Sequence, residues 1–305
     1  MNGAVNGALM WGEGMRRLIA ALMLIAALPL CAQAEPMEVC GVAADTQDEQ
    51  LDLGNLREID VPALMDALDR MPNLEKADMY AAKLTKEEME LLFARYPQID
   101  FGWTIRMAEH TVRTDATAFS TLHNSHSEAH GSRTFELLKY CRHLRAIDLG
   151  HNWVEDISFL RHFPELKVLI LGRNQITDLS VIGELTQLEY LEIFSNHITD
   201  LSPLESLTQL LDLNIAYNRI EDLSPLYALP QIERLWGYNN KKLTQEAQQA
   251  LESVNPDCEY DWVNNPTAGT WREHPRYFVI KEMFATGVYK PFEEYKEEET
   301  GGKHP

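Results

Sequence analysis

The stretch LKVLILGRNQITDLSVIGELTQ, residues 166–187, is followed without a gap by LEYLEIFSNHITDLSPLESLTQ, residues 188–209, and the two lines can be superposed residue for residue. The same 22-residue period extends over residues 144–229 without an insertion. The lines share the order LxxLxLxxN, with isoleucine in some leucine places. Asparagines recur at this spacing, at Asn152, Asn174, Asn196, Asn218 and Asn240.

The spacing of the apolar residues predicts a short strand followed by a return segment in every line. Apolar side chains at the fourth and sixth places alternate as in a strand, and the later apolar places bring the chain back along a second side. Stacked turns can bury this row, at about 1.5–3 kcal/mol for each enclosed Leu or Ile before the entropy cost. The asparagine lies where the strand turns inward, so its amide is predicted to bond backbone groups of its own and neighbouring coils. We interpret the asparagine column as structural.

This pattern is the signature of leucine-rich repeats. The regular coils resemble the internalin-type subfamily of bacteria, whose phrase is close to NxIxDLSPLxxLxxLxxLxL. In this sequence the phrase is carried by Asn196, Ile198, residues 200–204, Leu207, Leu210, Leu213 and Ile215. The resemblance covers residues 141–243.

The resemblance implies an α/β fold, a right-handed leucine-rich repeat solenoid with a curved parallel sheet on its concave side. Short helical or irregular segments would form the convex side, and protein recognition would be the general role. The ends resemble those of secreted leucine-rich repeat proteins of Gram-positive gut bacteria, in particular at residues 271–277. The chain departs from internalins because their cap, an immunoglobulin-like domain and a wall-sorting signal are not found. Wall attachment and host-cell invasion are therefore not implied.

The charge balance limits the classes of partner. The 305 residues carry a formal net charge of −20. Nucleic acids and anionic membranes attract clustered Lys and Arg, so neither is an expected partner. We expect a monomer that binds a protein, with a surface glycan as the other possibility and a basic partner favoured by the net charge.

The first residues predict export. Arg16 and Arg17 precede the apolar residues 18–30, and Ala32 and Ala34 supply a small-x-small cleavage site. We predict a signal peptide cleaved after Ala34, and hence a secreted or cell-surface protein without a transmembrane span.

The cysteines leave two questions open. Cys31 would allow a lipoprotein, but Leu30 stands where lipoprotein signals need a small residue, so this is the less favoured reading. Cleavage leaves Cys40, Cys141 and Cys258, an odd number that allows at most one disulfide. Burial as small apolar side chains is the stronger reading for the last two.

Two further segments can be aligned without gaps, residues 85–103 and residues 244–262. Each begins with a helix-capping threonine, continues to a proline and ends in an alternating strand that finishes in Trp. Cys258 takes the place of Ile99 and is therefore predicted to point into the core. The second copy would close the solenoid.

The chain is predicted to divide into five parts. They are a signal peptide (1–34), an amino-terminal cap with degenerate repeats (35–140), regular leucine-rich repeats (141–243), a carboxyl-terminal closing unit and cap (244–292) and a disordered acidic tail (293–305). Residues 35–49 are expected to be loose. The aromatic segment at residues 271–292 is expected to pack over the open carboxyl end of the core.

The candidate binding site is the set of strand side chains that point away from the core, on the concave face. They are Asp148, His151, Arg173, Glu189, Tyr190, Glu192, Phe194, Asp212, Tyr217, Arg234, Trp236 and Tyr238. Aromatic residues are enriched at protein interfaces, which favours binding. The alternative is that these aromatics pack against one another across strands.

Two sets of polar residues are candidates for metal binding. His123, His126 and His130 would share one face of a helix, but the Asn, Ser and Gly residues among them favour a solvated loop. A column of aspartates is predicted to bond local backbone rather than calcium, at Asp156, Asp178, Asp200 and Asp222. We therefore predict neither a metal site nor a cofactor.

The sequence contains none of the common catalytic motifs, such as HExxH, GxSxG or a phosphate-binding glycine loop. We therefore expect a non-enzymatic, exported module that binds a protein or a surface glycan through its concave face. One alternative is a structural or assembly module of the cell envelope. Another is a metal-dependent enzyme that uses the histidine loop.

Overall fold

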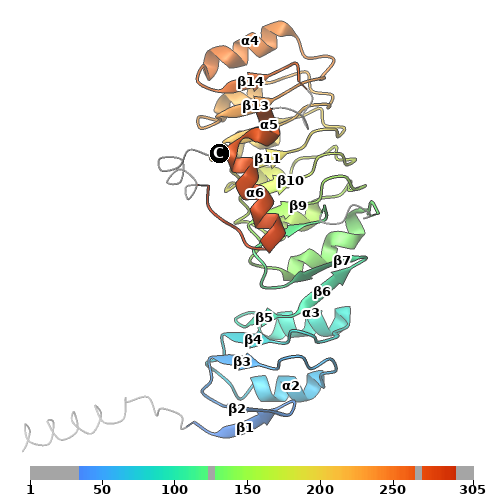
Figure 1. Cartoon of the computed structure of the whole chain (residues 1–305), viewed down its shortest axis with the longest axis vertical. Coiled ribbons are helices and arrows are strands. Elements are labelled where there is room, and N and C mark those ends of the chain that lie inside the picture. The colour runs from blue at the N-terminus through green and yellow to red at the C-terminus, as the bar shows by residue number, and fades with distance from the viewer. Residues whose placement is uncertain (1–33, 123–127, 265–269, 293–305) are drawn as a thin grey trace, which may run out of the picture.

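The structure is a computed structural model that describes residues 34–122, 128–264 and 270–292. The predicted signal peptide up to residue 33, the acidic tail, His123 and His126 lie outside the described residues. The described chain is an elongated stack of coils, with the amino-terminal unit at one end and a carboxyl-terminal helix along one side (Figure 1). No helix in the described ranges is both long and apolar enough to cross a bilayer.

A seven-stranded parallel sheet forms one side of the stack, in the order β14-β13-β12-β11-β10-β9-β8. Its strands are β8 (Ala118–Ser120), β9 (Ala146–Asp148), β10 (Val168–Ile170), β11 (Tyr190–Glu192), β12 (Asp212–Asn214), β13 (Arg234–Trp236) and β14 (Glu259–Asp261). Tyr190 is paired with Asp212, and Asp212 with Arg234, so the register advances by one repeat per strand. The predicted leucine-rich repeat solenoid is confirmed.

Short 3-10 helices form the opposite, convex side. They are η1 (Ser132–Tyr140), η2 (Ser158–His162), η3 (Ile182–Glu184), η4 (Ser202–Ser206) and η5 (Ser224–Ala228). An aspartate before each of the last four helices accepts a hydrogen bond from the backbone N–H of the serine two residues later. Asp200 Oδ1, for example, accepts the backbone N–H of Ser202 at 2.8 Å, and Pro203 lies in the first turn. The predicted local role of the aspartate column is confirmed.

The asparagines form a buried ladder between coils. The Oδ1 of Asn196 accepts the N–H of Ile176 at 3.0 Å, and its Nδ2 donates to the carbonyls of Leu171 and Ile193 at 3.0 Å each. One side chain thereby satisfies three backbone groups of two neighbouring coils that would otherwise be buried without partners. The structural interpretation of this column is confirmed.

The amino-terminal unit begins with an antiparallel hairpin of β1 (Pro36–Val39) and β2 (Val42–Asp45). The expectation that residues 35–49 are loose is wrong. Cys40 and Gly41 both have positive φ, so they form a tight two-residue turn between two alternating segments. Cys40 is half-buried and unpaired, and Cys141 and Cys258 are buried and unpaired.

Two helix-containing coils follow this hairpin. Strands β3 (Gln50–Asp52), β4 (Lys76–Asp78) and β5 (Asp100–Gly102) form a parallel sheet, and helices α2 (Val61–Leu68) and α3 (Lys86–Arg95) lie on the convex side. A second antiparallel hairpin, β6 (Thr104–Met107) and β7 (His110–Arg113), separates this sheet from the seven-stranded one.

The two aligned segments fold in the same way, as predicted. Thr85 caps α3 through a capping box with Glu88, and Thr244 caps α4 (Gln245–Val254). Strands β5 and β14 follow these helices. Cys258 is 8% exposed and packs in the main core, which confirms its predicted place.

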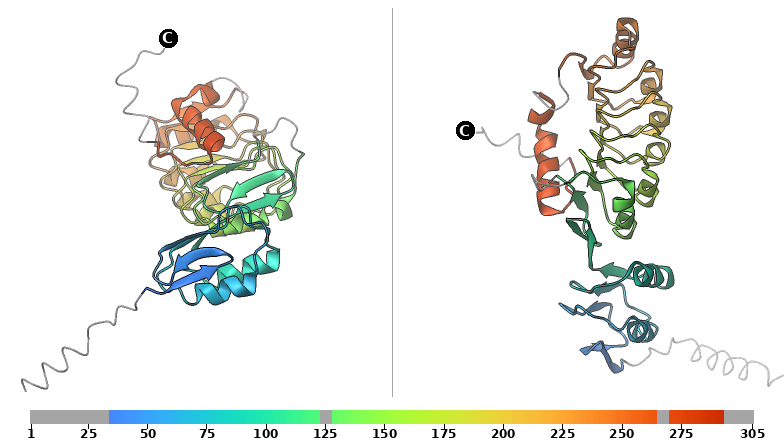
Figure 2. Two further views of the ribbon diagram at one scale, coloured as in Figure 1. Left: turned by 60° about the horizontal axis from the view of Figure 1, so that its bottom comes forward. Right: turned by 90° about the vertical axis from the view of Figure 1, so that its right-hand side faces the viewer.

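The last described segment, residues 270–292, is here called the strap. It consists of α5 (Thr270–Glu273), α6 (Pro275–Thr286) and the segment to Phe292. The side view shows α6 lying along the sheet side, opposite the side that carries the short helices (Figure 2). The expectation that this segment covers the open carboxyl end of the core is wrong. The unit formed by α4 and β14 occupies that end. The apolar side chains of the strap pack instead against side chains of the concave sheet.

Candidate recognition site

The strap lies against the middle of the predicted binding site, over Tyr190, Glu192, Asp212, Arg234 and Trp236. The backbone N–H groups of Thr117 and Ala118, beside β8, donate to the carbonyl of Gly287, which ends α6 in a left-handed conformation. Seven of the predicted ligand-binding residues are buried, Asp148, Tyr190, Glu192, Phe194, Asp212, Arg234 and Trp236. The expectation that they form an open surface is wrong. While the strap and the neighbouring coils cover them, they cannot contact a partner.

Glu192 is the acidic anchor of the strap. Its carboxylate accepts the indole N–H of Trp271 at 3.0 Å and two guanidinium N–H groups of Arg272 at 2.9 and 2.8 Å. The hydroxyl of Tyr190 donates to the same carboxylate. Burial is the largest single effect and acts to lower the pKa of Arg272, but the attractions to Glu192, Tyr190, Tyr277 and Asp148 together outweigh it and raise the pKa above its ordinary value.

A second ionic group lies beside the first. Asp212 is fully buried and accepts Arg276 at 2.8 Å and Arg234 at 2.6 Å. Arg276 also reaches Glu233, and the Arg234 guanidinium lies 4.5 Å from the Trp271 ring centroid. Buried charges persist only where they are paired, and here the pairs join the strap to the sheet.

Apolar side chains fill the space around these ion pairs. The Trp271 ring lies 5.6 Å from that of Tyr190 and 5.0 Å from that of Trp236. Further along the strap, Ile280, Met283, Phe284 and Phe292 pack with Ala118, Ala146, Val168 and Ile170 of the sheet. Two of the predicted aromatic residues, Tyr190 and Trp236, are thus partners of the chain's own carboxyl-terminal segment.

Phe194 is buried in another way, against the backbone of the preceding coil. Its ring covers Gly172, and a Cβ at that glycine would overlap the ring. The Trp262 ring likewise covers Gly237 three coils later. Glycine is required at both places because an aromatic ring occupies the side-chain position.

Asp148 is a buried carboxylate near the edge of the covered face. It accepts the backbone N–H of Gly150 at 2.9 Å and the hydroxyl of Ser120 at 3.1 Å. Burial is the largest effect on its pKa, and the nearby carboxylate of Glu192 adds to it, so the pKa rises to about 6.

Five predicted residues remain accessible, His151, Arg173, Glu189, Tyr217 and Tyr238. Three of them belong to a continuous row at the ends of the concave strands, here called the left-handed row. Its members are His151, Arg173, Ser195, Tyr217 and Asn239, all with φ between 54° and 61°. Backbone hydrogen bonds link the coils at this row, for example from Arg173 N–H to the carbonyl of Phe194 at 2.8 Å.

A hollow of about 400 Å³ adjoins the carboxyl-terminal part of the row. Tyr217 and Asn239 line it together with Arg219, Lys241 and Lys242. The Tyr217 and Tyr238 rings meet edge to face, with centroids 5.3 Å apart. Burial and the nearby arginines Arg173 and Arg272 lower the pKa of His151, at the other end of the row. The surface combines aromatic and basic groups on an otherwise acidic protein.

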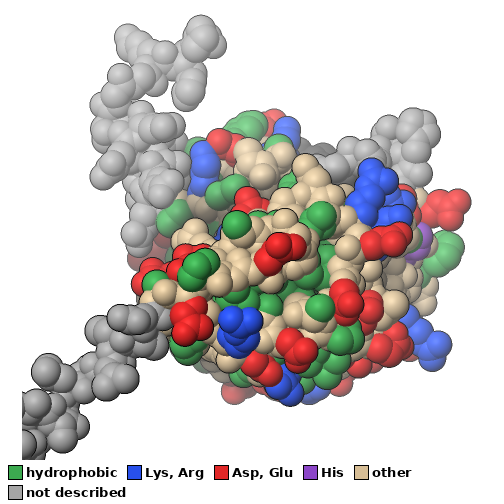
Figure 3. Space-filling view, turned by 90° about the horizontal axis from the view of Figure 1, so that it is seen from below, with side chains coloured by type: hydrophobic (Ala, Val, Ile, Leu, Met, Phe, Trp, Pro, Cys, Tyr) green, Lys and Arg blue, Asp and Glu red, His purple; other side chains and the backbone are tan. Residues whose placement is uncertain are grey.

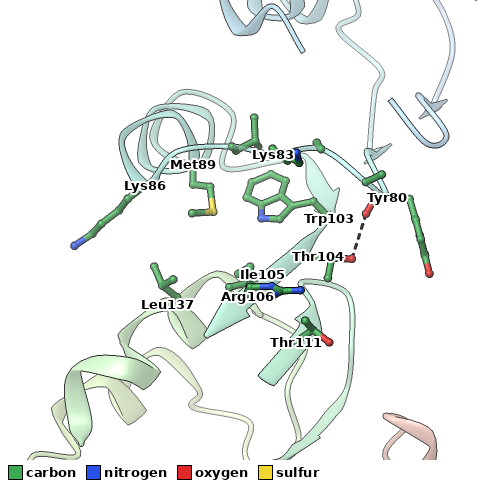
Figure 4. A pocket seen from close by; sticks show the side chains of 13 residues that line it. Tyr80, Lys83, Lys86, Met89, Trp103, Thr104, Ile105, Arg106, Thr111 and Leu137 are labelled. Atoms are coloured by element: carbon green, nitrogen blue, oxygen red, sulfur yellow. Dashed lines mark hydrogen bonds between the residues drawn. The ribbon is translucent and has the colours of Figure 1, made fainter. Parts of the chain in front are cut away.

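A second hollow, of about 580 Å³, lies between α3 and the β6–β7 hairpin. Met89, Trp103 and Leu137 line it, with Lys83, Lys86 and Arg106 among the surrounding side chains (Figure 4). In contrast, acidic and basic side chains are intermixed on the amino-terminal end of the molecule (Figure 3). This hollow offers an apolar floor with basic groups at its rim.

Of the predicted histidine set, only His130 lies in the described ranges. His130 lies beside Glu109 and His110, whose side chains sequence reasoning did not connect to it. The strap residues Trp271, Arg272 and Arg276 were also missed as partners of the concave face. The sequence carried a signal for this contact, because Arg272 and Arg276 have the charge that complements Glu192 and Asp212.

A family model described as leucine-rich repeats (2 copies) matches residues 142–184, 164–206 and 186–228. The chain is a leucine-rich repeat protein. No curated protein matches the sequence. The family match falls on the coils that were predicted from the 22-residue period.

Several solved structures are similar. Internalin C2 of Listeria monocytogenes shares 22% identity over 70% of this chain and 80% of that one, with a TM-score of 0.39. A leucine-rich repeat protein of Leptospira interrogans shares 20% over 70% of this chain and 54% of that one, with a TM-score of 0.43. An internalin F of L. monocytogenes shares 20% over 66% and 71%, with a TM-score of 0.34. All three identities are below 25% and all three TM-scores are below 0.5.

Proposed function

We propose that this leucine-rich repeat protein is an exported, non-catalytic binding module that recognises a protein through the left-handed row and its adjoining hollow. Export rests on the predicted signal peptide. The binding surface proposed from the sequence is retained at its accessible positions, His151, Arg173, Glu189, Tyr217 and Tyr238. The strap-covered positions instead hold the strap.

The observation that carries the proposal is the residue choice in the row. A left-handed conformation costs a residue with a side chain roughly 1–2 kcal/mol, and glycine avoids this cost. Five successive coils nevertheless place His151, Arg173, Ser195, Tyr217 and Asn239 at this position. Two of these residues, His151 and Arg173, are exposed and the other three are partly exposed. Side chains in place of glycine along one accessible edge support a functional role for that edge.

The chemistry of the row favours an acidic protein segment with apolar side chains. Arg219 and Lys241 are exposed and line the hollow together with Tyr217, whose ring offers an apolar contact. Arginine and tyrosine are the residue types that contribute most at protein interfaces. The local basic character outweighs the expectation of a basic partner, which rested on the net charge alone.

Site-specific cross-linking tests this proposal. A photoreactive amino acid at Ser195, in the middle of the row, is expected to cross-link a discrete protein when the full chain is exposed to its native surroundings. The same group at Glu205, which is exposed on the convex helix η4, serves as the matched control and is expected to give no such product.

Competition identifies the side chains that matter. Excess unlabelled protein is expected to abolish the Ser195 product, whereas a protein with Arg173→Gly and Tyr217→Gly is expected to compete at least tenfold less well. Both substitutions suit the left-handed backbone, so folding is retained. Equal cross-linking from both faces, or equal competition by the glycine variant, would contradict the proposal and favour a structural module of the envelope.

A further inference from the structure

His130 occupies a place that is apolar in the next four coils. Its backbone N–H donates to Asn152 Oδ1 at 2.9 Å, just as the N–H of Val154 donates to Asn174 Oδ1 at 2.9 Å. The corresponding residues of the next coils are Val154, Ile176, Ile198 and Ile220, all with 0% exposure. An imidazole in this column requires polar partners, because a half-buried polar group without them is costly.

The partners come from the β6–β7 hairpin. Glu109 lies in the hairpin turn and its Oε2 is 2.7 Å from His130 Nε2. His110, the first residue of β7, is 6% exposed, and its Nε2 lies 3.4 Å from Glu109 Oε1. One possible ligand atom from each of the three residues lies within 4.8 Å of the other two.

We propose that Glu109, His110 and His130 bind a zinc-like divalent cation. Two imidazoles and a carboxylate form a zinc ligand set, and tetrahedral bonds of about 2.0–2.1 Å place ligand atoms about 3.3 Å apart. His130 Nε2 lies 2.7 Å from Glu109 Oε2 and His110 Nε2 lies 3.4 Å from Glu109 Oε1, so both imidazoles lie beside the same carboxylate. Small shifts of the side chains complete the set.

The surrounding backbone positions the ligands. Glu109 Oε1 accepts the N–H of Glu128 at 3.1 Å, which orients the carboxylate and leaves Oε2 for the cation. The His130 backbone is fixed by Asn152 and by the N–H of Trp153, which donates to the His130 carbonyl at 2.9 Å. Glu109 is 35% exposed, so the cation enters from its side. The bound cation ties the hairpin to the segment that enters the first regular coil.

Calorimetric titration of the full chain with zinc at neutral pH tests the site. One zinc ion is expected to bind with a Kd in the micromolar range or tighter, and magnesium is expected not to bind, because imidazole ligands favour zinc. Saturating zinc is expected to raise Tm by several degrees. Glu109→Gln and His130→Val are each expected to weaken zinc binding by at least tenfold.

His130→Val supplies the residue type found in the equivalent places, so the variant is expected to fold, as circular dichroism would check. His143→Ala is the matched control. His143 Nε2 lies 2.9 Å from Asp100 Oδ1, a histidine–carboxylate pair outside the proposed site, and its loss is expected to leave zinc affinity unchanged. Absence of zinc binding by the folded wild-type chain, or an affinity unaffected by both Glu109→Gln and His130→Val, would overturn the proposal.

Discussion

The indole nitrogen of Trp271 donates a hydrogen bond of 3.0 Å to the carboxylate of Glu192, although the two residues are 79 positions apart in the chain. Arg272 adds two charge-assisted hydrogen bonds to the same carboxylate. The carboxylate lies on β11, in the middle of the concave sheet. The strap is thus held at a defined point of the repeat array.

Glu192→Gln is expected to lower the free energy of unfolding by about 3 kcal/mol, because it removes one partner of a buried ion pair. Chemical denaturation measures this loss, and hydrogen exchange is expected to accelerate in residues 270–292. Glu189→Gln is the control, since Glu189 pairs with Lys167 at 2.8 Å in a partly exposed site and should cost less than about 1 kcal/mol. Equal effects of the two substitutions would argue against an anchoring role for Glu192.

Asn196→Ala is expected to destabilise the fold by about 1–3 kcal/mol, because it leaves the N–H of Ile176 and the carbonyls of Leu171 and Ile193 without their partner. Urea denaturation measures the change. A neutral substitution would mean that the ladder does not satisfy these groups in solution.

Asp148→Asn is expected to stabilise the protein at pH 7 by about 1–3 kcal/mol. The folded pKa of about 6 exceeds the unfolded value of about 3.9. Between these values the folded state binds more protons, so the contribution of Asp148 to stability falls as pH rises from about 4 to 6 and is constant above. Denaturation curves at several pH values should show this fall in the wild type and a flatter profile in the variant. A steeper profile in the variant would contradict the assignment.

Gly172→Ala is expected to cost about 1–3 kcal/mol, since its Cβ overlaps the buried Phe194 ring. Gly150→Ala, one coil earlier, places its Cβ 3.2 Å from the Asp148 carboxylate and should cost less. Thermal denaturation of the pair provides the comparison, and a larger loss at Gly150 would show that the Phe194 ring can move aside.

The periodic part of the fold was predictable because every coil repeats the same local chemistry. The leucine spacing, the asparagine at the ninth place and the turn with Asp and Ser two residues apart recur in successive coils, and each predicts the same local geometry. The paired units that begin at Thr85 and Thr244 were also predictable, because a capping threonine and a strand ending in Trp recur at one spacing. The β1–β2 hairpin was missed, although the Gly41 turn between alternating segments carried a signal for it.

The location of the strap was not predictable from periodicity. Its contacts join residues far apart in sequence, and an apolar segment can cover an open core end or a sheet face equally well by pattern alone. The choice depends on the pairing of Arg272 with Glu192 and of Arg276 with Asp212, which requires the register of the sheet. The accessible part of the candidate site could not be separated from the covered part for the same reason.

Helix α6 spans the sheet between two fixed points. Arg276, near its start, binds Asp212 on β12, and Gly287, just after its end, accepts hydrogen bonds beside β8. Twelve helical residues extend about 18 Å, and the four strand spacings from β8 to β12 measure about 19 Å. Repeat arrays ordinarily gain or lose units freely. Here an added or deleted coil between β8 and β12 would leave one end of the helix out of reach, so the length of α6 matches the number of coils between these two strands.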